Sequence, residues 1–284
     1  MNKKILILGS SGLLGSSLSN FFINNNIPIL CHSRNSSSDL SADLTLQEDT
    51  LTMLRRVIPD VIINLTGMTN VDFCENNPQA AYLSNVKIIE NIKLYLTRDN
   101  SNCHLIHIST DHLYDSPGNS KIHEINIKNY YAFSKYAGEL VASSIPRNVS
   151  ILRTNFFGLS LCQERKSFTD WLYESAQKKI NINVFNDVKF SPLSMNSLLK
   201  YIVLIIEYGP IGLMNLGSID GMSKADFAFL FIDKLGLDCS FMKRVDSTDI
   251  SKNFNIPRPF DMRMNSVNFE KTFNVKLPTL SKEI

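Results

Sequence analysis

The sequence predicts an α/β protein with a doubly wound parallel sheet, followed by a smaller C-terminal lobe. Three observations support this fold class. Short β-branched runs alternate with longer amphipathic stretches through the first two-thirds of the chain. Such an order gives parallel strands joined by helices that cover both faces of the sheet. The 284 residues, of which 44% are hydrophobic, are also enough to build a large core without disulfides or metals.

The first elements follow from local patterns. Lys4–Leu8 is a short apolar run that ends at a glycine, as expected for a buried strand. Gly12–Ile23 is expected to be a helix, because its leucines and phenylalanines recur at spacings of three and four. Ile27–Cys31 is the second expected strand. Thr45–Val57 is expected to be a helix with one apolar face, and Pro59 ends it.

The same alternation continues for five more segments. Val61–Leu65 is the third expected strand, and Pro78–Leu96 is expected to be one helix with proline in its first turn. His104–Ser109 is the fourth strand, where His107 is expected to be a core histidine rather than a base. Tyr130–Ser144 is expected to be a helix and Val149–Arg153 the fifth strand.

The pattern changes after about Phe157. Three helices, one short strand and a loop-rich, proline-containing end are expected there: Ser167–Gln177, Met195–Tyr208, Ser223–Leu235, Leu213–Leu216 and Asn253–Ile284. We therefore divide the chain into residues 1–157, which hold the parallel sheet, and residues 158–284, which form the smaller lobe. The boundary is soft, because segments of the two parts interleave in many such folds.

Composition excludes several classes of protein. A net charge of +2 gives no reason to expect nucleic acid or an anionic membrane as a partner. The densest apolar runs, Tyr201–Ile206 and Phe227–Ile232, are too short to span a membrane, and Ile5–Leu8 is too short for the core of a signal peptide. The five scattered cysteines lack a C-x-x-C pair, which predicts a reduced, cytoplasmic protein. No metal site is predicted, because four of the histidines lack metal-ligand spacing: His32, His104, His112 and His123.

A glycine-rich run follows the first strand and opens the first helix. Residues 9 to 15 read Gly-Ser-Ser-Gly-Leu-Leu-Gly, a G-x-x-G-x-x-G spacing. Such a loop lets the backbone approach a pyrophosphate at a helix N-terminus. A plain glycine-rich turn is the alternative, but the position after an N-terminal strand favours a Rossmann-like dinucleotide-binding domain over residues 1–157. The expected cofactor-binding residues here are Gly9, Ser11, Gly12, Leu13 and Leu14.

Tyr131 and Lys135 lie four residues apart and therefore on one face of a helix. A neighbouring ammonium favours the phenolate, so Lys135 is expected to lower the pKa of Tyr131 towards the range of a general acid or base. Tyr130 lies on another face. The hydroxyls of Ser109 and Thr110 stand at the carboxyl edge of the sheet, where ligands bind in doubly wound folds. The alternatives are an exposed Tyr–Lys pair and hydroxyls that only cap a turn.

The end of the second strand bears on the choice of cofactor. An acidic residue there is typical of NAD-binding proteins, but this chain has Ser33 and Arg34 and no carboxylate before Asp39. Arg34 can pair with a ribose 2′-phosphate, and Ser33 can add a hydrogen bond. NADPH is therefore expected to be preferred, with NADH as the alternative. If Arg34 lies in solvent instead, the protein is indifferent to the phosphate.

Further segments make the resemblance specific. The chain resembles the dTDP-4-dehydrorhamnose reductase-like family of the extended short-chain dehydrogenase/reductases. Besides the glycine loop, five matching segments carry the resemblance: Pro59–Asn64, Ile108–Asp111, Tyr131–Glu139, Leu152–Asn155 and Arg258–Pro259.

The resemblance implies a role for each matching residue. Tyr131 would protonate a carbonyl oxygen as hydride arrives, Lys135 would hold the nicotinamide ribose, and Thr110 would orient the carbonyl. Asn85 would support the site, although a surface asparagine is the equal alternative. The implied cofactor contacts, beyond those above, are Asp43, Leu44, Leu65, Thr66 and Gly67. The implied substrate contacts are Thr69, Asp111, His112, Asn155, Phe156 and Arg258.

The implied activity is NAD(P)H-dependent reduction of a nucleotide-linked 4-keto-6-deoxy sugar in polysaccharide biosynthesis, such as the dTDP-rhamnose route. Arg258 stands between two prolines, so a stiff backbone would present it to the pyrophosphate, unless it is only a solvated loop arginine. Two alternatives stay open: a nucleotide-sugar epimerase or dehydratase, and a cofactor-binding regulatory subunit without turnover. The expected partner is the nucleotide sugar, and a homodimer is compatible with this interpretation.

Overall fold

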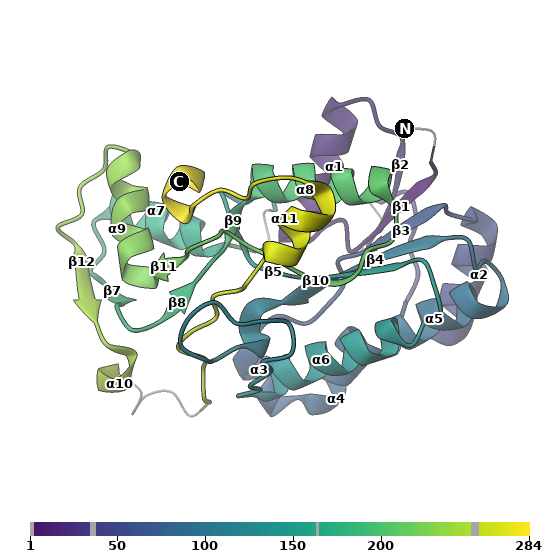
Figure 1. The fold of residues 1–284 in the computed structure, drawn as a ribbon, viewed down its shortest axis with the longest axis horizontal. Helices are drawn as coiled ribbons and strands as arrows, with labels where there is room; N and C mark the ends of the chain where they lie inside the picture. The colour runs from purple at the N-terminus through teal and green to yellow at the C-terminus, as the bar shows by residue number, and fades with distance from the viewer. Residues whose placement is uncertain (1–2, 35–37, 163–164, 251–255) are drawn as a thin grey trace. The chain divides into compact units, whose positions relative to one another are not determined.

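The main sheet has six strands, five from the first 154 residues and one from residues 212–216 (Figure 1). The computed structural model describes residues 3–34, 38–162, 165–250 and 256–284. The sheet order is β10-β5-β4-β3-β1-β2. These strands are β1 (Ile5–Leu8), β2 (Ile29–His32), β3 (Val61–Asn64), β4 (His104–Thr110), β5 (Val149–Thr154) and β10 (Gly212–Leu216). β1 pairs in parallel with β2 and β3, and β3 pairs in parallel with β4. The predicted doubly wound α/β fold is confirmed.

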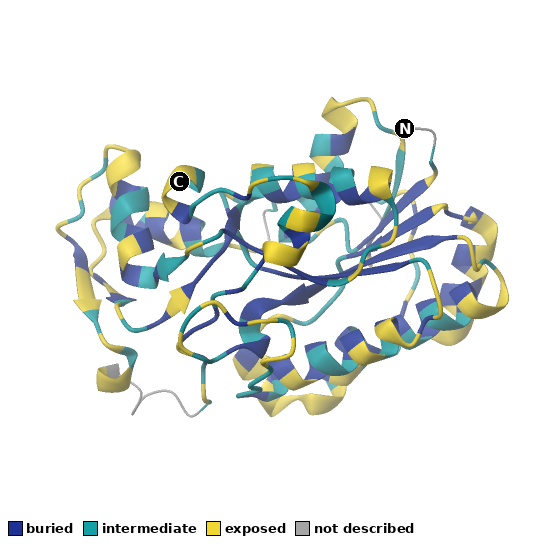
Figure 2. Cartoon of the chain, viewed as in Figure 1, coloured by how far each residue is buried: buried dark blue, intermediate teal, exposed yellow. Residues whose placement is uncertain are grey.

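Helices cover both faces of this sheet. In Figure 1, α1 (Leu13–Asn24) and α8 (Met195–Tyr208) lie on one face, whereas α2 (Gln47–Val57), α5 (Ile88–Arg98) and α6 (Tyr130–Ser143) lie on the other. All residues of β1, β3 and β4 are buried, as expected for strands covered on both sides. Figure 2 shows the same burial along the strands and on the inward faces of the helices.

The chain forms two compact units that interleave along the sequence. Unit 1 comprises Met1–Thr110, Asn129–Arg153 and Leu199–Met214. Unit 2 comprises Asp111–Lys128, Thr154–Leu198 and Asn215–Ile284. The expectation that everything after about residue 157 forms the smaller lobe is therefore wrong for most of α8 and for the start of β10.

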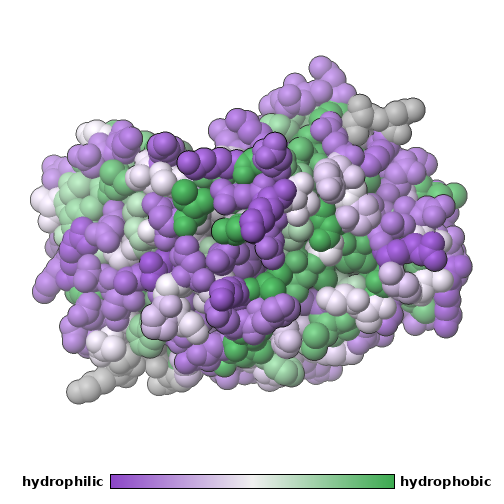
Figure 3. Space-filling model, in the orientation of Figure 1, coloured by the Kyte–Doolittle hydropathy of each residue, from purple (hydrophilic) through white to green (hydrophobic). Residues whose placement is uncertain are grey.

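The start of β10 belongs to unit 1 because the strand extends the sheet beside β5. Leu213 packs against the hydrophobic cluster of this unit. Around β10, Figure 3 shows a group of hydrophobic residues on the face that it draws.

The expected helix over Pro78–Leu96 is divided into three parts. α4 (Pro78–Tyr82) runs into a π-helical turn, Leu83–Lys87, before α5 begins. A shorter helix, α3 (Val71–Asn76), precedes them. Extra residues in a helical turn frequently mark functional positions, because they turn a side chain out of the regular helical register.

Unit 2 has short strand pairs and helices around an aromatic core. The pairs are β7 (Ile182–Phe185) with β12 (Met242–Val245), β8 (Lys189–Phe190) with β11 (Met222–Ser223), and β6 (Phe156–Phe157) with β9 (Leu193–Ser194). Its helices are a 3-10 turn (Asp111–Leu113), α7 (Phe168–Lys178), α9 (Lys224–Lys234), α10 (Ser247–Ile250), α11 (Val267–Phe273) and α12 (Leu280–Glu283). The ring of Phe227 packs against those of Phe157, Phe168 and Phe190. Within the described ranges, no helix combines the length and apolar character that crossing a membrane requires.

Candidate functional site

The glycine loop of unit 1 opens α1 without a side-chain cap. Gly12 is the N-cap residue and offers no side-chain hydrogen bond to the first turn, so N–H groups of that turn are left for another acceptor. Gly9 has a φ of 83°, and its N–H donates to the main-chain oxygen of His32 at 3.0 Å. A Cβ at Gly15 would lie 2.2 Å from the oxygen of Gly9, so only glycine lets the helix start this close to the loop. Ser11, Leu13 and Leu14 are on this same turn.

The loop after β3 lies directly beside the glycine loop. A Cβ at Gly9 would approach the main-chain nitrogen of Thr66 to 3.1 Å. Thr66 donates from both its hydroxyl and its N–H to Oδ1 of Asn64, at 2.6 and 3.2 Å, so the loop turns sharply as the strand ends. The predicted residues Leu65 and Thr66 therefore adjoin Gly9 at the carboxyl edge of the sheet, whereas Gly67 lies near Asn85 and Lys135. This edge, between β1 and β3, is where the strand order reverses and where such sheets bind ligands.

Asn85 holds the next part of that loop from the π-helical turn. Its Oδ1 accepts from the N–H of Met68 at 2.8 Å, and its Nδ2 donates to Met68 O and to Ser134 Oγ at 3.1 and 2.8 Å. Asn85 is only 2% exposed, so the alternative of a surface asparagine is wrong. The residue joins the loop that carries Gly67 and Thr69 to helix α6.

Helix α6 packs against β4 and carries the predicted tyrosine and lysine. Asn129 caps the helix by accepting from the N–H of Ala132 at 3.0 Å, which fixes where the first turn begins. Tyr131 and Lys135 are buried, at 7% and 5% exposure, and Thr110 at the end of β4 is 5% exposed. The alternative of an exposed Tyr–Lys pair is therefore wrong. Tyr130 is partly buried and packs against Phe133 instead.

Lys135 is a cation in a nearly closed environment. Its Nζ donates to the main-chain oxygen of Ile108 at 2.8 Å, and a Cβ at Gly67 would lie 3.8 Å from it. Burial lowers the pKa of Lys135 to about 8, and the charge of Glu139 opposes that shift. Burial also lowers the pKa of His107, with Lys135 adding to the effect, so this histidine is neutral. Its Nδ1 is 3.1 Å from Nδ2 of Asn64, as expected for a core histidine.

The residues predicted to contact the adenine end of the cofactor differ in how far they are buried. Arg34 is exposed, and its charge lies close enough to Asp43 to help lower the pKa of that carboxyl, which is lowered chiefly by the hydrogen bond from Thr45. Ser33 is buried, and its hydroxyl donates to Ser38 Oγ at 3.1 Å. Leu44 lies in the core cluster. Their roles at a cofactor stay predictions.

Unit 2 contains a cavity of about 370 Å³ with three cations in its wall. Lys128, Lys224 and Arg258 line it together with the predicted substrate residue His112. The rest of the wall is largely apolar: Phe185, Val188, Ile256, Pro257, Pro259, Phe260 and Met262, beside Ser247. Burial lowers the pKa of His112 to about 3, with Lys224 and Arg258 adding to the effect, so this ring is neutral. The cavity has the size and mixed lining of a small-molecule site.

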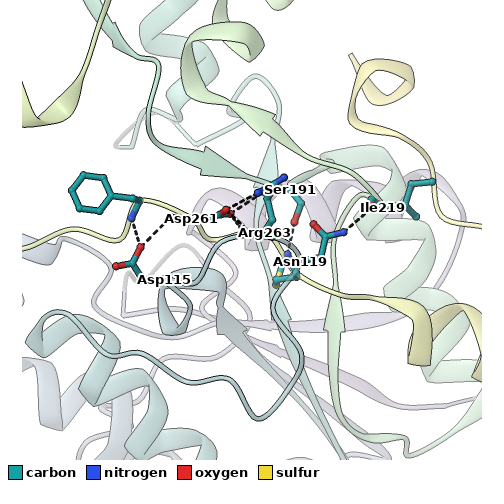
Figure 4. Close-up of polar contacts among 9 residues, drawn as sticks. Asp115, Asn119, Ser191, Ile219, Asp261 and Arg263 are labelled. Atoms are coloured by element: carbon teal, nitrogen blue, oxygen red, sulfur yellow. Dashed lines mark hydrogen bonds and ion pairs between the residues drawn. The ribbon is translucent and has the colours of Figure 1, made fainter.

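A network of carboxylates holds the walls of unit 2 in place, as Figure 4 shows. Asp115 accepts from the N–H groups of Phe260 and Asp261 at 2.6 and 3.1 Å, and it also pairs with Lys128 at 2.9 Å. Asp261 in turn pairs with Arg263 at 2.6 Å and accepts from Gly118 N at 3.0 Å. The loop after the 3-10 turn is thereby fixed to the segment that carries Arg258.

The other predicted substrate residues of unit 2 lie near the start of that loop. Nδ2 of Asn155 donates to Oδ2 of Asp111 at 2.6 Å, and Asp111 is 1% exposed. Phe156 is partly buried in β6. The carboxylate of Asp111 also acts on Lys224, whose pKa is lowered by burial and raised by this charge.

Sequence reasoning missed Lys224 and Lys128. Lys224 follows a serine that caps α9, because Ser223 Oγ accepts from the N–H of Asp226 at 3.0 Å. Capping by serine shows where the helix begins, but nothing in the local sequence shows that the next side chain lines a cavity. Within the described residues, Nζ of Lys224 makes no hydrogen bond or ion pair, and it lies 5.9 Å from the ring centroid of Phe168.

Comparison with known proteins shows which sequences and solved structures this chain resembles. It is 24% identical over 288 residues to the dTDP-4-dehydrorhamnose reductase of Salmonella typhimurium, covering 96% of this chain and 93% of that protein. The crystal structure of a Bacillus anthracis dTDP-4-dehydrorhamnose reductase in complex with NADP superposes with a TM-score of 0.88 at 20% identity, covering 100% and 97% of the two chains. The Bordetella bronchiseptica enzyme WbmG in complex with NAD superposes with a TM-score of 0.82 at 17% identity, covering 100% and 91%.

The family model described as the RmlD substrate binding domain matches residues 3–284, nearly the whole chain. This match confirms the resemblance inferred from the sequence, and the protein belongs to the RmlD substrate binding domain family.

Proposed function

We propose that the protein is an NAD(P)H-dependent reductase of a nucleotide-linked 4-keto-6-deoxy sugar, acting in the cytoplasm in polysaccharide biosynthesis. The observation that carries the proposal is Lys135, a buried cation one helical turn after Tyr131, in the same unit as the glycine loop. A buried ammonium is costly to maintain, and active sites are where such groups are concentrated.

The residues of unit 1 fit a dinucleotide. The uncapped start of α1 and the close approach of Gly9 to Thr66 form a backbone cradle that a Cβ would fill. The N–H groups of the first turn of α1, which begins after Gly12, would hold the pyrophosphate, and Lys135 would hold the nicotinamide ribose. When bound, the reduced nicotinamide supplies the hydride that adds to the carbonyl carbon.

The chain itself would supply the proton. Tyr131 would donate its phenolic proton to the carbonyl oxygen, while Thr110 would hold that oxygen by a hydrogen bond. The ammonium of Lys135 would stabilise the phenolate that Tyr131 becomes. The product would be the hydroxyl compound, with the added hydrogen on carbon and the proton on oxygen.

The cavity of unit 2 supports a nucleotide diphosphate as the carrier of the sugar. Lys224 and Arg258 both line this cavity, and two cations in one wall complement a doubly charged pyrophosphate. The apolar part of the wall offers a surface for a nucleoside. We add Lys224 to the proposed substrate contacts on this ground.

The chemistry of His112 argues against the dehydratase alternative. A dehydratase of this superfamily has an acid and a base after the strand-end threonine, where this chain has Asp111 and His112. A histidine with a pKa of about 3 is a weak base at neutral pH. A binding subunit without turnover would have no use for the buried set of Thr110, Tyr131 and Lys135.

The proposal is tested by incubating the protein with NADPH or NADH and a panel of 4-keto sugar nucleotides. Loss of reduced cofactor with formation of the 4-hydroxy sugar is expected. Cofactor binding without consumption across the panel would favour the binding subunit. A homodimer stays a prediction, to be checked by sedimentation.

A further inference from the structure

A buried ion pair in unit 1 joins helix α6 to the strands β4 and β5. Arg153 donates to Glu139 through Nη2 at 2.6 Å and through Nε at 2.9 Å, and each side chain is 2% exposed. The hydroxyl of Ser109 donates to the same carboxylate oxygen that Arg153 Nε contacts. Residues of β4 and β5 therefore both contact the one carboxylate that α6 provides.

The Glu139 carboxylate is connected to each of the three proposed catalytic residues, either along α6 or through Ser109. Glu139 lies one helical turn after Lys135 and two turns after Tyr131, on the same face of α6. Ser109, which Glu139 holds, immediately precedes Thr110. Lys135 itself reaches back to Ile108 on the same strand.

We propose that Glu139 is a positioning residue for the reduction: together with Ser109 and Arg153, it fixes α6 against the end of β4 and sets the electrostatic environment of Lys135. This rests on the proposed function. Stability alone is a weak reason for such a pair, because buried ion pairs can often be replaced by apolar residues of similar volume without loss of stability.

Glu139 is the electrostatic partner of Lys135, because the other described groups around the lysine carry no negative charge. On β4, His107 is neutral and Ile108 offers only a main-chain oxygen. The loop after β3 offers Gly67, and the π-helical turn offers the neutral amide of Asn85 behind it. On α6, Tyr131 carries the phenol that donates the proton in the proposed reaction. Arg153, on β5, is the cation paired with Glu139, and within the described residues Glu139 is the carboxylate whose charge acts on Lys135.

The first test measures Lys135 without any substrate. Lysines labelled with ¹³C at Cε are titrated by NMR, and the resonance missing from Lys135→Met assigns the residue. The titration midpoint of Lys135 should move to lower pH in Glu139→Gln. It should also move to lower pH in Glu139→Gln/Arg153→Met, which removes the arginine that would otherwise be left without its carboxylate. Glu139→Asp should restore much of the wild-type midpoint. An unchanged midpoint in either folded Gln variant would overturn the electrostatic role, whether or not the protein reduces any sugar.

The second test measures positioning with the reductase assay. Ser109→Ala removes the hydroxyl contact to Glu139 and leaves the Glu139–Arg153 ion pair in place. It is therefore the variant to use if Glu139→Gln does not fold. We expect a fall in kcat of about 10- to 100-fold with the KM for NADPH little changed, because misplacement of a reacting group costs roughly this much. Leu140→Ala, at an exposed position of the same helix, should leave both kcat and the Lys135 titration unchanged. A Ser109→Ala variant with wild-type kcat would overturn the positioning role.

Discussion

The ammonium of Lys135 donates to the main-chain oxygen of Ile108 at 2.8 Å, which ties the proposed catalytic helix to the strand that ends in Thr110. A peptide oxygen is only a dipole, so it compensates the desolvation of a full charge incompletely. This is why the pKa of Lys135 is lowered to about 8 even with a hydrogen bond. The cation remains protonated at neutral pH but lies close to its titration range.

Replacement of Tyr131 by phenylalanine should remove most turnover while NADPH still binds. The phenol donates the proton in the proposed reaction, and general acid catalysis contributes roughly 10²- to 10⁴-fold. The measurements are kcat with a 4-keto sugar nucleotide and NADPH affinity by fluorescence. Tyr130→Phe is the matched control, because its ring packs on Phe133, and it should be mild. Equal losses in the two variants would mean that the wrong tyrosine has been chosen.

Arg34 should give the protein a preference for NADPH over NADH. Its guanidinium can pair with the 2′-phosphate, and the sequence has no carboxylate between the end of the second strand and Asp39. The ratio of kcat/KM for the two cofactors should fall towards one in Arg34→Ala. If the wild-type ratio is already near one, or if the preference survives the substitution, Arg34 is not the determinant.

Removal of Lys224 or Arg258 should raise the KM for the nucleotide sugar and leave the KM for NADPH nearly unchanged. Each cation lines the cavity of unit 2, and a charge-assisted hydrogen bond contributes about 1.5–3 kcal/mol, or roughly 10- to 150-fold in affinity. Lys234→Ala is the control, because Lys234 is an exposed lysine in the last turn of the same helix as Lys224. Unchanged affinity in both cavity variants would remove this cavity from the substrate site.

Gly15→Ala should destabilise the fold and weaken cofactor binding together. The added Cβ would lie 2.2 Å from Gly9 O, so either α1 or the glycine loop must move. Overpacking of this kind costs about 1–3 kcal/mol in the free energy of unfolding, measured by urea denaturation. Asn20→Ala, at an exposed position of the same helix, should leave both properties intact. A Gly15→Ala protein with wild-type NADPH affinity would show that the helix start does not hold the cofactor.

Acid should destabilise unit 1 through His104. Burial lowers the pKa of this histidine to about 4, and its Nε2 is 2.8 Å from Ser150 Oγ. Between about pH 6.5 and 4 the unfolded state binds the proton and the folded state does not, so the free energy of unfolding falls as pH falls through this window. One unit of pKa corresponds to about 1.4 kcal/mol, which puts the loss at roughly 3 kcal/mol. His104→Gln should flatten the dependence of stability on pH in this window, and an equally steep dependence would assign it to other groups.

Much of this protein is determined by patterns that act over a few residues. The spacing of Gly9, Gly12 and Gly15 predicts the phosphate-binding turn, and the structure leaves no room for a Cβ at Gly15. The four-residue spacing of Tyr131 and Lys135 predicts a shared helix face. The alternating strands and helices predict the doubly wound sheet. These features depend on local geometry, so the sequence alone predicts them.

The remaining features depend on which distant segments meet. β10 joins the sheet beside β5, the π-helical turn brings Asn85 to Met68, and Lys224 reaches the cavity that also holds Arg258. Glu139 matches a family motif in sequence, but its pairing with Arg153 and Ser109 is visible only after α6 packs on the sheet. Such contacts arise from the packing of apolar faces against one another, and polar groups buried in the process are stable only where a partner is already present. That partner is chosen by the tertiary structure, because side chains far apart in the chain carry no local pattern that links them.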